Sequence, residues 1–402
     1  MHPDSSICII CKGSRLICGL PYCPLLKKYF IESSVRNKIE KLGDSIFGPS
    51  PPNLFVGHYG WPDVRIGPLV SFSEEETNFG INDDPSKWYG KSVDEIIKFR
   101  SSLLRPMIKT NVRGKTKQVD QIQNVMLSIK PIDIEAQISG KPHLTISFSS
   151  HLQPMGPSVK MKKMKVIDNP KIPKSVDTVI SEKMKAVESS QILFDKGCDV
   201  YYLTKVLSAG VLGIEKRMVP SRWSITATDD MISKYLISKI KNYDTISDYF
   251  VGSSEYMSNR FEILLMPGNW EFENFEAWAP GTLWSQGLNE PEIIEEYEGW
   301  NGRTKYSLQA GGYYASRYAA TEALDSMRKQ ARVIVFREIG SGYQIPLGVW
   351  VVREAAKRAY RNMKRFSNFN EAFLDISSRL KNPIDSYLKM SKILAQTKLV
   401  DF

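Results

Sequence analysis

Hydrophobic positions along the chain fall into separate runs with helical and strand periods. Apolar residues between positions 26 and 42 recur every three to four places, as on one face of a helix, whereas Leu144–Phe148 alternates as a half-buried strand does. Further helices are predicted over residues 93–104, 116–127, 176–194, 199–208, 229–241, 310–330, 353–366, 368–381 and 384–396. Strands are predicted over 53–57 and 64–70, within 247–280, and over 333–336 and 346–352. These separate runs predict an α+β (mixed α/β) fold.

Two of the predicted helices begin with capping signals. Ser92 is a favoured N-cap, and Glu95, three places later, completes a capping box for the helix that follows. Asp229 and Asp230 stand just before another predicted helix, and carboxylates are also favoured N-caps. We therefore expect one of these two aspartates to cap that helix.

The order of these patterns divides the chain into five segments. At roughly 100–200 residues per domain, a chain of 402 residues forms two to four structural units. The segments are a cysteine module (1–26), an N-terminal α+β part (27–152), a basic Pro/Lys-rich segment (153–175), a C-terminal α+β part (176–383) and a terminal helix with a tail (384–402). The segment 153–175 is either a surface crossover or a linker between the two halves.

Composition and charge limit the class of protein. Aromatic residues make up 11% of the chain, including eight Trp, which is too many for a disordered protein. A run of about 18 apolar residues that would span a membrane is missing, and the first residues lack the pattern of a secretory signal. The 54 Lys and Arg exceed the 44 Asp and Glu, and this net charge of +10 favours an anionic partner. Charge alone does not choose between nucleic acid, nucleotide and membrane surface.

Basic residues concentrate in the predicted helix 353–366. Spacings of three, four and seven places put many of them on one helical face, and only Glu354 opposes them. Such a stripe could follow the phosphates of a nucleic acid, although a solvated helix face is the commoner cause of the pattern. The stripe comprises Arg353, Lys357, Arg358, Arg361, Lys364 and Arg365.

Four of the five cysteines lie close together near the N-terminus, in the pattern C-x2-C-x6-C-x4-C. This clustering favours a metal site over a disulfide framework. Four thiolates suit a structural Zn²⁺ with no open coordination position, while an iron–sulfur cluster and unligated cysteines are the alternatives. The predicted zinc ligands are Cys8, Cys11, Cys18 and Cys23, whereas Cys198 is expected to be a small buried residue.

The last seven residues, QTKLVDF (396–402), fit the pattern Q-x-x-h-x-x-a of sliding-clamp-binding tails. In a 3₁₀-like turn, Leu399 and Phe402 lie on one face and can enter a single hydrophobic pocket, while the Gln396 amide anchors to backbone groups. The alternative is a helix end that packs Leu399 and Phe402 on its own domain. Placement at the end of the chain favours a tail that becomes ordered on binding.

Several polar and aromatic strings could bind a ligand or carry chemistry. Arg222, beside Trp223, could bind a carboxylate or phosphate as a fork. The segment 267–284 interleaves aromatic residues with carboxylates, including Glu271 and Glu273, which suits an acid/base pocket or a base-stacking platform. A half-buried strand with its Glu side chains outside explains the same alternation more simply. The candidate ligand-binding or catalytic residues are Arg222, Trp223, Asp229, Asp230, Glu271, Arg353 and Glu354.

The loop 58–65 and the later segment 311–317 are also rich in groups that bind ligands, but the sequence does not say which segments meet in space. The glycine turn at 208–213 lacks the lysine and spacing of a phosphate-binding loop. His/Ser/Asp and His/Cys arrangements of recognisable spacing are missing, so nucleophilic catalysis has no support in the sequence.

Long ordered strings of the chain resemble the archaeal Nre family of DNA-repair proteins, of the NreA type. The strings run over nearly the whole length, so the resemblance is more specific than any single motif. They are CKGS (11–14), CGL (18–20), FVGHYG (55–60), RIGP (65–68), MGPS (155–158), LSAGVLG (207–213), VPSRWSITA (219–227), GGYYASR (311–317) and PLGVWVVRE (346–354).

The resemblance implies a cytoplasmic, nucleoid-associated protein that helps to repair damaged DNA. It implies a zinc finger on the four clustered cysteines and docking on the PCNA sliding clamp through a C-terminal PIP box at Gln396, Leu399 and Phe402. This chain ends at the first aromatic residue of that motif, so we expect weaker clamp binding than for the fuller motif. The resemblance supplies no reaction. An enzyme acting on a nucleotide, a nucleic-acid base or a modified DNA end therefore stays open, as does a structural zinc protein that binds no nucleic acid.

Overall fold

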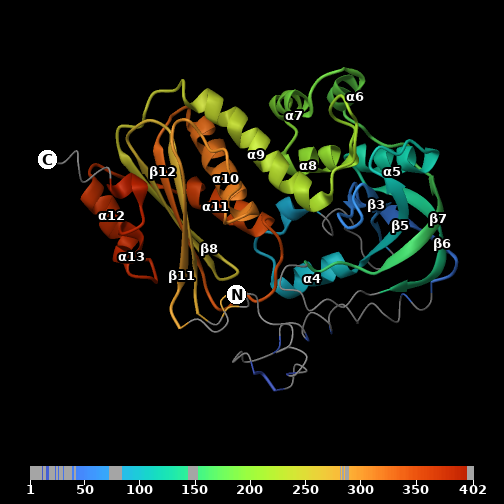
Figure 1. Ribbon diagram of the computed structural model, residues 1–402, viewed down its shortest axis with the longest axis horizontal. Helices are drawn as coiled ribbons and strands as arrows, with labels where there is room; N and C mark the ends of the chain where they lie inside the picture. Colours follow the sequence, from blue (N-terminus) through green and yellow to red (C-terminus); the bar gives the residue numbers. More distant parts are fainter. Residues whose placement is uncertain are drawn as a thin grey trace. The chain divides into compact units, whose positions relative to one another are not determined.

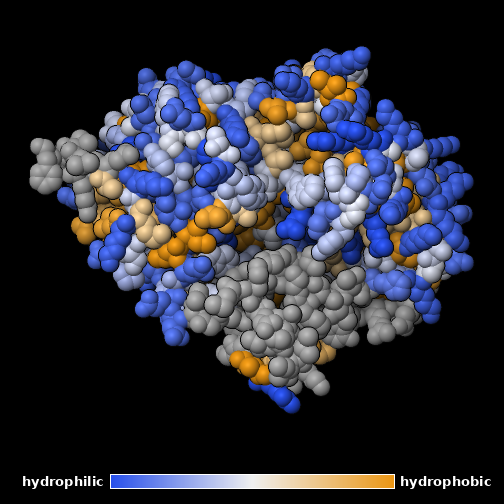
Figure 2. Space-filling view, viewed as in Figure 1, coloured by the Kyte–Doolittle hydropathy of each residue, from blue (hydrophilic) through white to orange (hydrophobic). Residues whose placement is uncertain are grey.

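The computed structural model describes two compact units, each with its own mixed sheet (Figure 1). The described residues are 11, 15–17, 23, 26, 30, 39, 42–71, 84–143, 153–280, 282, 285 and 289–395. The β1–β7 unit comprises Leu25–Ser147 and Gln153–Ile232, and the β8–β13 unit comprises Met1–Pro24, Phe148–Leu152 and Ser233–Phe402. The predicted α+β class is confirmed. Hydrophilic residues dominate the face seen in Figure 2, and no helix in the described ranges is long and apolar enough to cross a membrane.

The β1–β7 unit is built on a sheet of order β1-β6-β7-β5-β3-β2, with β4 paired to β5. Its strands are β1 (Ser45–Ser50), β2 (Leu54–Val56), β3 (Asp63–Pro68), β4 (Val70–Ser71), β5 (Leu103–Asn111), β6 (Ile132–His143) and β7 (Ser158–Val166). Strands β5 and β7 run parallel, whereas the other named pairs are antiparallel. Its helical segments are η1 (Pro85–Lys87), α4 (Val93–Ser101), α5 (Lys117–Leu127), α6 (Lys174–Ser181), α7 (Ala186–Asp195) and α8 (Val200–Ala209).

The capping box predicted for helix α4 is present. The Ser92 hydroxyl accepts a hydrogen bond from the Glu95 backbone N–H at 3.3 Å, and the Glu95 carboxylate accepts one from the Ser92 N–H at 2.8 Å. The helix ends at Ser101, three residues earlier than predicted, because Leu103 already belongs to strand β5. Local capping chemistry therefore sets the start of this helix, and the sheet sets its end.

Helix α5 contacts strands β2, β3 and β7 and buries its apolar side chains, among them Val119 and Ile122. Strand β7 lies between β6 and β5, within the lysine-rich segment 153–175, and buries Val159, Met161 and Met164. The lysines between these apolar residues, Lys160, Lys162, Lys163 and Lys165, are exposed. This strand therefore has one apolar side and one basic side, as expected for a strand with one covered face.

The β8–β13 unit is built on a sheet of order β11-β10-β12-β9-β8-β13. Its strands are β8 (Tyr249–Tyr256), β9 (Asn259–Met266), β10 (Glu271–Trp278), β11 (Glu292–Glu298), β12 (Arg332–Ile339) and β13 (Lys364–Phe366). Helices α10 (Gly311–Met327) and α11 (Trp350–Arg361) lie on one side of this sheet, and α12 (Phe369–Ser377) and α13 (Ile384–Leu388) lie on the other (Figure 1). The central strands are consequently apolar along most of their length.

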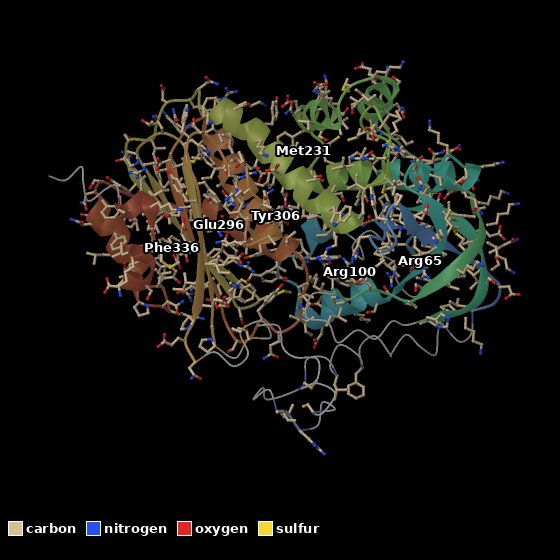
Figure 3. All side chains as sticks on the ribbon, viewed as in Figure 1. Arg65, Arg100, Met231, Glu296, Tyr306 and Phe336 are labelled. Atoms are coloured by element: carbon tan, nitrogen blue, oxygen red, sulfur yellow. The ribbon has the colours of Figure 1, made fainter. Side chains whose placement is uncertain are left out.

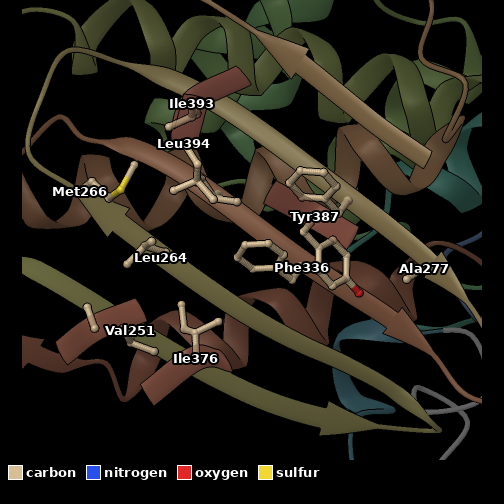
Figure 4. Packing of buried hydrophobic residues seen from close by; sticks show 12 residues of the cluster. Val251, Leu264, Met266, Ala277, Phe336, Ile376, Tyr387, Ile393 and Leu394 are labelled. Carbon is tan, nitrogen blue, oxygen red and sulfur yellow. The ribbon is translucent and has the colours of Figure 1, made fainter. Parts of the chain in front are cut away.

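The core between the sheet and helices α12 and α13 is rich in aromatic residues (Figure 4). Phe336 of β12 is stacked with Phe275 of β10 at 5.4 Å between ring centroids, and it meets the edge of Tyr387 at 5.1 Å. Ile393 and Leu394, near the end of the described chain, are buried in the same cluster. The chain is thus held in the core up to the residues that precede the predicted clamp-binding tail.

Two element predictions near the C-terminus are wrong. The apolar run 346–352 is not a strand, because helix α11 begins at Trp350, whose indole N–H donates to the Leu347 carbonyl at 2.8 Å. The helix predicted to reach residue 366 ends at Arg361, and Lys364–Phe366 form strand β13 against β8. A short apolar run fits a buried helix and a buried strand equally well, so only the neighbouring elements decide between them.

Candidate functional site

The first turn of helix α9 (Ser221–Ile240) lies in the β1–β7 unit and is tied to strand β2 through Ser221. The Ser221 hydroxyl accepts a hydrogen bond from the Val56 N–H at 3.0 Å and lies 3.3 Å from the Leu54 carbonyl, to which it can donate. This pairing joins segments about 165 residues apart in sequence. It places the loop after β2 beside Arg222 and Trp223.

The chain reaches this turn through a glycine that ends helix α8. Gly210 has the left-handed φ of 71°, and a Cβ there would lie 2.3 Å from the backbone of Arg217 and Met218. The Ser208 hydroxyl then donates to the Val219 carbonyl at 2.8 Å. The string LSAGVLG (207–213) therefore has a structural role: it ends helix α8 and allows residues 217–220 to pack against the end of that helix.

The loop between β2 and β3 carries the partner aromatic residues. Gly60, with φ 80°, allows a tight turn in which the Asp63 N–H donates to the Gly60 carbonyl at 2.8 Å. Trp61 then lies against Trp223 with ring centroids 5.4 Å apart and an interplanar angle of 54°. These two side chains are 39% and 46% exposed, and Tyr59 is 80% exposed. Trp61 and Trp223 therefore form an exposed aromatic pair, and the exposed ring of Tyr59 belongs to the same loop as Trp61.

Charge and aromatic surface coincide here. Burial lowers the pKa of His58 below its ordinary value, and the positive charge of Arg222 lowers it further. The His58 and Tyr59 rings are 4.1 Å apart. We call His58, Tyr59, Trp61, Arg222 and Trp223 the Trp61–Trp223 site. Flat, exposed rings beside a guanidinium suit stacking on a base and contact with a phosphate.

The predicted capping role of Asp229 and Asp230 is wrong. Helix α9 begins at Ser221, eight residues before Asp229, so both aspartates lie inside the helix. Asp229 is fully buried and Asp230 is half-buried. Neither aspartate is part of the exposed Trp61–Trp223 site. The helix begins directly after Pro220, whose carbonyl accepts hydrogen bonds from the Trp223 and Ser224 N–H groups at 2.8 and 3.0 Å.

The carboxylates of β10 do not alternate as predicted. Glu271 is half-buried at the first position of the strand and forms an ion pair with Arg332 at 3.1 Å. Glu273 and Glu276 point into buried surroundings, because helices cover both sides of this sheet. Glu276 pairs with Arg337, its direct neighbour on β12. The expectation of outward Glu side chains is therefore corrected at Glu273 and Glu276.

The basic residues 353–365 do not form one helical stripe. Arg353 is buried in α11, Lys357 pairs with Glu322 at 2.7 Å, and Glu354 is half-buried. Arg358 and Arg361 are exposed on α11. Lys364 and Arg365 belong to strand β13 and form ion pairs with Asp375 at 3.3 Å and Asp248 at 2.8 Å.

The predicted metal and clamp-binding residues lie largely outside the described residues. Cys11 is buried and Cys23 half-buried, whereas Cys8, Cys18 and the tail 396–402 are not described. Within the described ranges, no three His, Cys, Asp or Glu side chains are grouped as metal ligands. Cys198, expected to be buried, is half-buried, and burial raises the pKa of its thiol.

The basic segment 153–175, predicted to be a surface crossover or a linker, contains strand β7 (Ser158–Val166). Residues 159–165, VKMKKMK, alternate buried apolar residues with exposed lysines, the period of a strand. The pairing of Trp61 with Trp223 had no local signal, because it joins residues 162 positions apart.

These features define a two-unit α+β protein with an exposed aromatic and basic site. The chain belongs to the archaeal Nre family: the region described as "Archaeal Nre, N-terminal" matches residues 17–285, and "Archaeal Nre, C-terminal" matches residues 298–402. The resemblance seen in the sequence strings is thus confirmed.

Three curated relatives are similar over most of the chain. "DNA repair protein NreA" of Archaeoglobus fulgidus is 38% identical over 385 residues, which cover 93% of this chain and 94% of that protein. "DNA repair protein NreB" of the same organism is 38% identical over 354 residues, 88% of each chain. "DNA repair protein NreA" of Haloferax volcanii is 32% identical over 381 residues, 90% of this chain and 89% of that protein. No solved structure matches the chain.

Proposed function

We propose that this chain is a DNA-repair protein that is recruited to DNA by the PCNA sliding clamp and that carries a structural zinc finger. The observation that carries the proposal is the family match, which spans both parts of the chain and includes relatives named as DNA repair proteins. Recruitment rests on the motif 396–402 at the end of the matched region, and zinc binding rests on the cysteine motif 8–23, of which Cys18 and Cys23 lie inside the matched region and Cys8 and Cys11 before it.

The anchoring of residues 391–394 supports a docking role for the segment that follows. The Glu273 carboxylate accepts hydrogen bonds from the Ser391 hydroxyl and from the Lys392 N–H at 2.6 Å. Ile393 and Leu394 are buried, whereas Ala395 is exposed. The motif begins at the next residue, Gln396, so the clamp can bind the motif without disturbing the core.

Clamp binding is tested with a variant that removes the two apolar anchors, Leu399→Ala/Phe402→Ala. Because a few apolar side chains carry most of a small interface, we expect at least a tenfold loss of affinity for an archaeal PCNA, about 1.4 kcal/mol, by isothermal titration calorimetry. The matched control is Lys398→Ala/Asp401→Ala, which changes the positions that the motif leaves variable. Equal affinity of the two variants would contradict recruitment through this motif.

The zinc finger is proposed on Cys8, Cys11, Cys18 and Cys23, since a set of four thiolates suits structural Zn²⁺. When bound, the ion would hold the N-terminal module together without taking part in a reaction. We expect one zinc per chain by elemental analysis of the purified protein, lost in Cys8→Ser/Cys11→Ser and retained in Cys198→Ser. Iron in place of zinc, or zinc retained in the double variant, would refute the assignment.

A further inference from the structure

The outward side of the β1–β7 sheet carries cations on three adjacent strands. Arg65 on β3 (Figure 3) lies directly opposite Lys109 on β5. Lys160 on β7 lies opposite Met107, two residues before Lys109 and therefore on the same side. Lys163 and Lys165 continue along β7, opposite Gln137 and Glu135 of β6. We call Arg65, Lys109, Lys160, Lys163 and Lys165 the basic sheet face.

These cations are available to a ligand. All five side chains are exposed, and none of the five makes an ion pair with a described residue. The acidic groups on the same side are Asp133 and Glu135 of β6, the strand next to β7, where Glu135 lies directly opposite Lys165. On β3, Asp63 accepts a hydrogen bond from the Asn111 side-chain amide at 2.9 Å. Like charges directly opposite each other on neighbouring strands destabilise a sheet. An anion that bridges Arg65 and Lys109 would remove this cost.

The basic sheet face continues into the Trp61–Trp223 site. Trp61 stands two residues before β3 begins and four before Arg65, and the Val112 N–H donates to the Pro62 carbonyl at 2.9 Å. The loop that carries Trp61 is therefore fixed to the end of β5, the strand that carries Lys109. Arg65 and Lys109 are therefore close along their strands to the loop that carries the exposed ring of Trp61. Cations near exposed aromatic rings are the arrangement by which proteins hold a backbone of phosphates and stack its bases.

We propose that the basic sheet face and the Trp61–Trp223 site together bind single-stranded DNA, with phosphates on the five cations and a base on Trp61 or Trp223. The inference deepens the proposed repair function and rests on it for the choice of DNA as the occupant. A single strand fits better than a duplex, because bases stacked within a duplex cannot reach the rings. The footprint across strands β3, β5 and β7 covers two strand spacings, about 10 Å.

The test measures binding of a fluorescent 20-nucleotide oligo-dT to the full chain by anisotropy across a salt series. The variant Lys109→Gln/Lys160→Gln/Lys163→Gln removes three phosphate contacts and should lower the slope of log affinity against log salt by about 2. The matched control, Lys174→Gln/Lys183→Gln/Lys196→Gln, removes the same charge from exposed positions in other parts of the same unit and should keep the slope. Equal slopes for the two triple variants would overturn the proposal.

The stacking part is tested separately with Trp223→Ala, for which we expect a roughly 5- to 150-fold loss of affinity for oligo-dT. Trp300→Ala, at a tryptophan 43% exposed in the β8–β13 unit, is the control and should bind as the unaltered chain does. Equal losses in the two variants, tighter binding of a duplex of the same length, or no affinity of the unaltered chain for oligo-dT at low salt would each overturn the proposal.

Clamp binding of the same variants separates this inference from the proposed function. The triple lysine variant should bind PCNA as the unaltered chain does, because its substitutions lie far along the sequence from residues 396–402. Loss of DNA affinity with clamp binding intact supports the basic sheet face. Intact DNA affinity in Leu399→Ala/Phe402→Ala shows that a failure of clamp recruitment leaves this surface in place.

Discussion

The two units use charged residues in opposite ways. In the β8–β13 unit, Glu276 and Arg337 face each other on adjacent central strands and are almost fully buried, and Glu298 and Arg317 form a second buried pair. In the β1–β7 unit, Arg65 and Lys109 occupy an equivalent pair of opposed positions, but both are cations and both are exposed. One sheet is covered by helices on both sides, and the other leaves a basic side open.

The contrast shows how burial decides what a charge can do. A charge that leaves water without a partner costs several kcal/mol, so the central strands of the β8–β13 unit carry carboxylate and guanidinium together. Exposed cations pay little of this cost and need no partner within the chain. The positive charge that can act on a ligand is therefore found on the open sheet, although the helix predicted to carry a basic stripe, 353–366, belongs to the covered unit.

The largest expected effect is the cost of breaking a buried pair. Arg337→Met removes the partner of Glu276 and two hydrogen bonds to the Asn259 amide oxygen, at 3.1 and 2.7 Å. We expect the free energy of unfolding to fall by about 3–5 kcal/mol in urea denaturation, because Glu276 stays buried and unpaired. The matched change on the open sheet, Arg65→Met, should alter stability by no more than about 0.5 kcal/mol.

A double variant sharpens the first comparison. Glu276→Gln/Arg337→Met removes both charges and should recover much of the lost stability, since the uncompensated carboxylate causes most of the cost. Similar losses of unfolding free energy in Arg337→Met and Arg65→Met would contradict the idea that a buried cation needs its partner more than an exposed cation does.

A smaller effect is expected at Glu273, a buried carboxylate held by hydrogen bonds. Burial raises its pKa from 4.5 to about 7, helped by the nearby Glu295, although hydrogen bonds from Ser391 and Lys392 act against the shift. The folded chain thus binds this proton more tightly than the unfolded chain, so stability falls as pH rises from 4.5 to about 7 and then levels off.

Glu273→Gln cannot titrate and should flatten that fall. Above pH 7 we expect the variant to be more stable than the unaltered chain by an amount of order 1–3 kcal/mol, measured by urea denaturation at several pH values. The same pH dependence in both proteins would show that Glu273 is not the group responsible. The comparison also tests whether Glu273 holds residues 391–394 as a neutral acid.

Local signals in the sequence were reliable where a few neighbouring residues decide the outcome. The capping box of Ser92 and Glu95, the strand at 333–336 and the long helix near 310–330 were all predicted, with ends shifted by a few residues. Errors arose where distant contacts decide. The run 346–352 became the start of a helix, and Asp229 became an interior helix residue because the helix begins earlier, at Ser221.

The sequence by itself determined the family, the α+β class and the two motifs that suggest zinc and clamp binding, because these depend on residue identity and short spacing. Only the tertiary structure decided which cations are buried in pairs and which are open, and that Trp61 meets Trp223. The physical reason is that burial and contact between remote residues depend on how strands and helices cover one another. The spacing of residues along the chain does not show which side of a sheet is exposed to solvent.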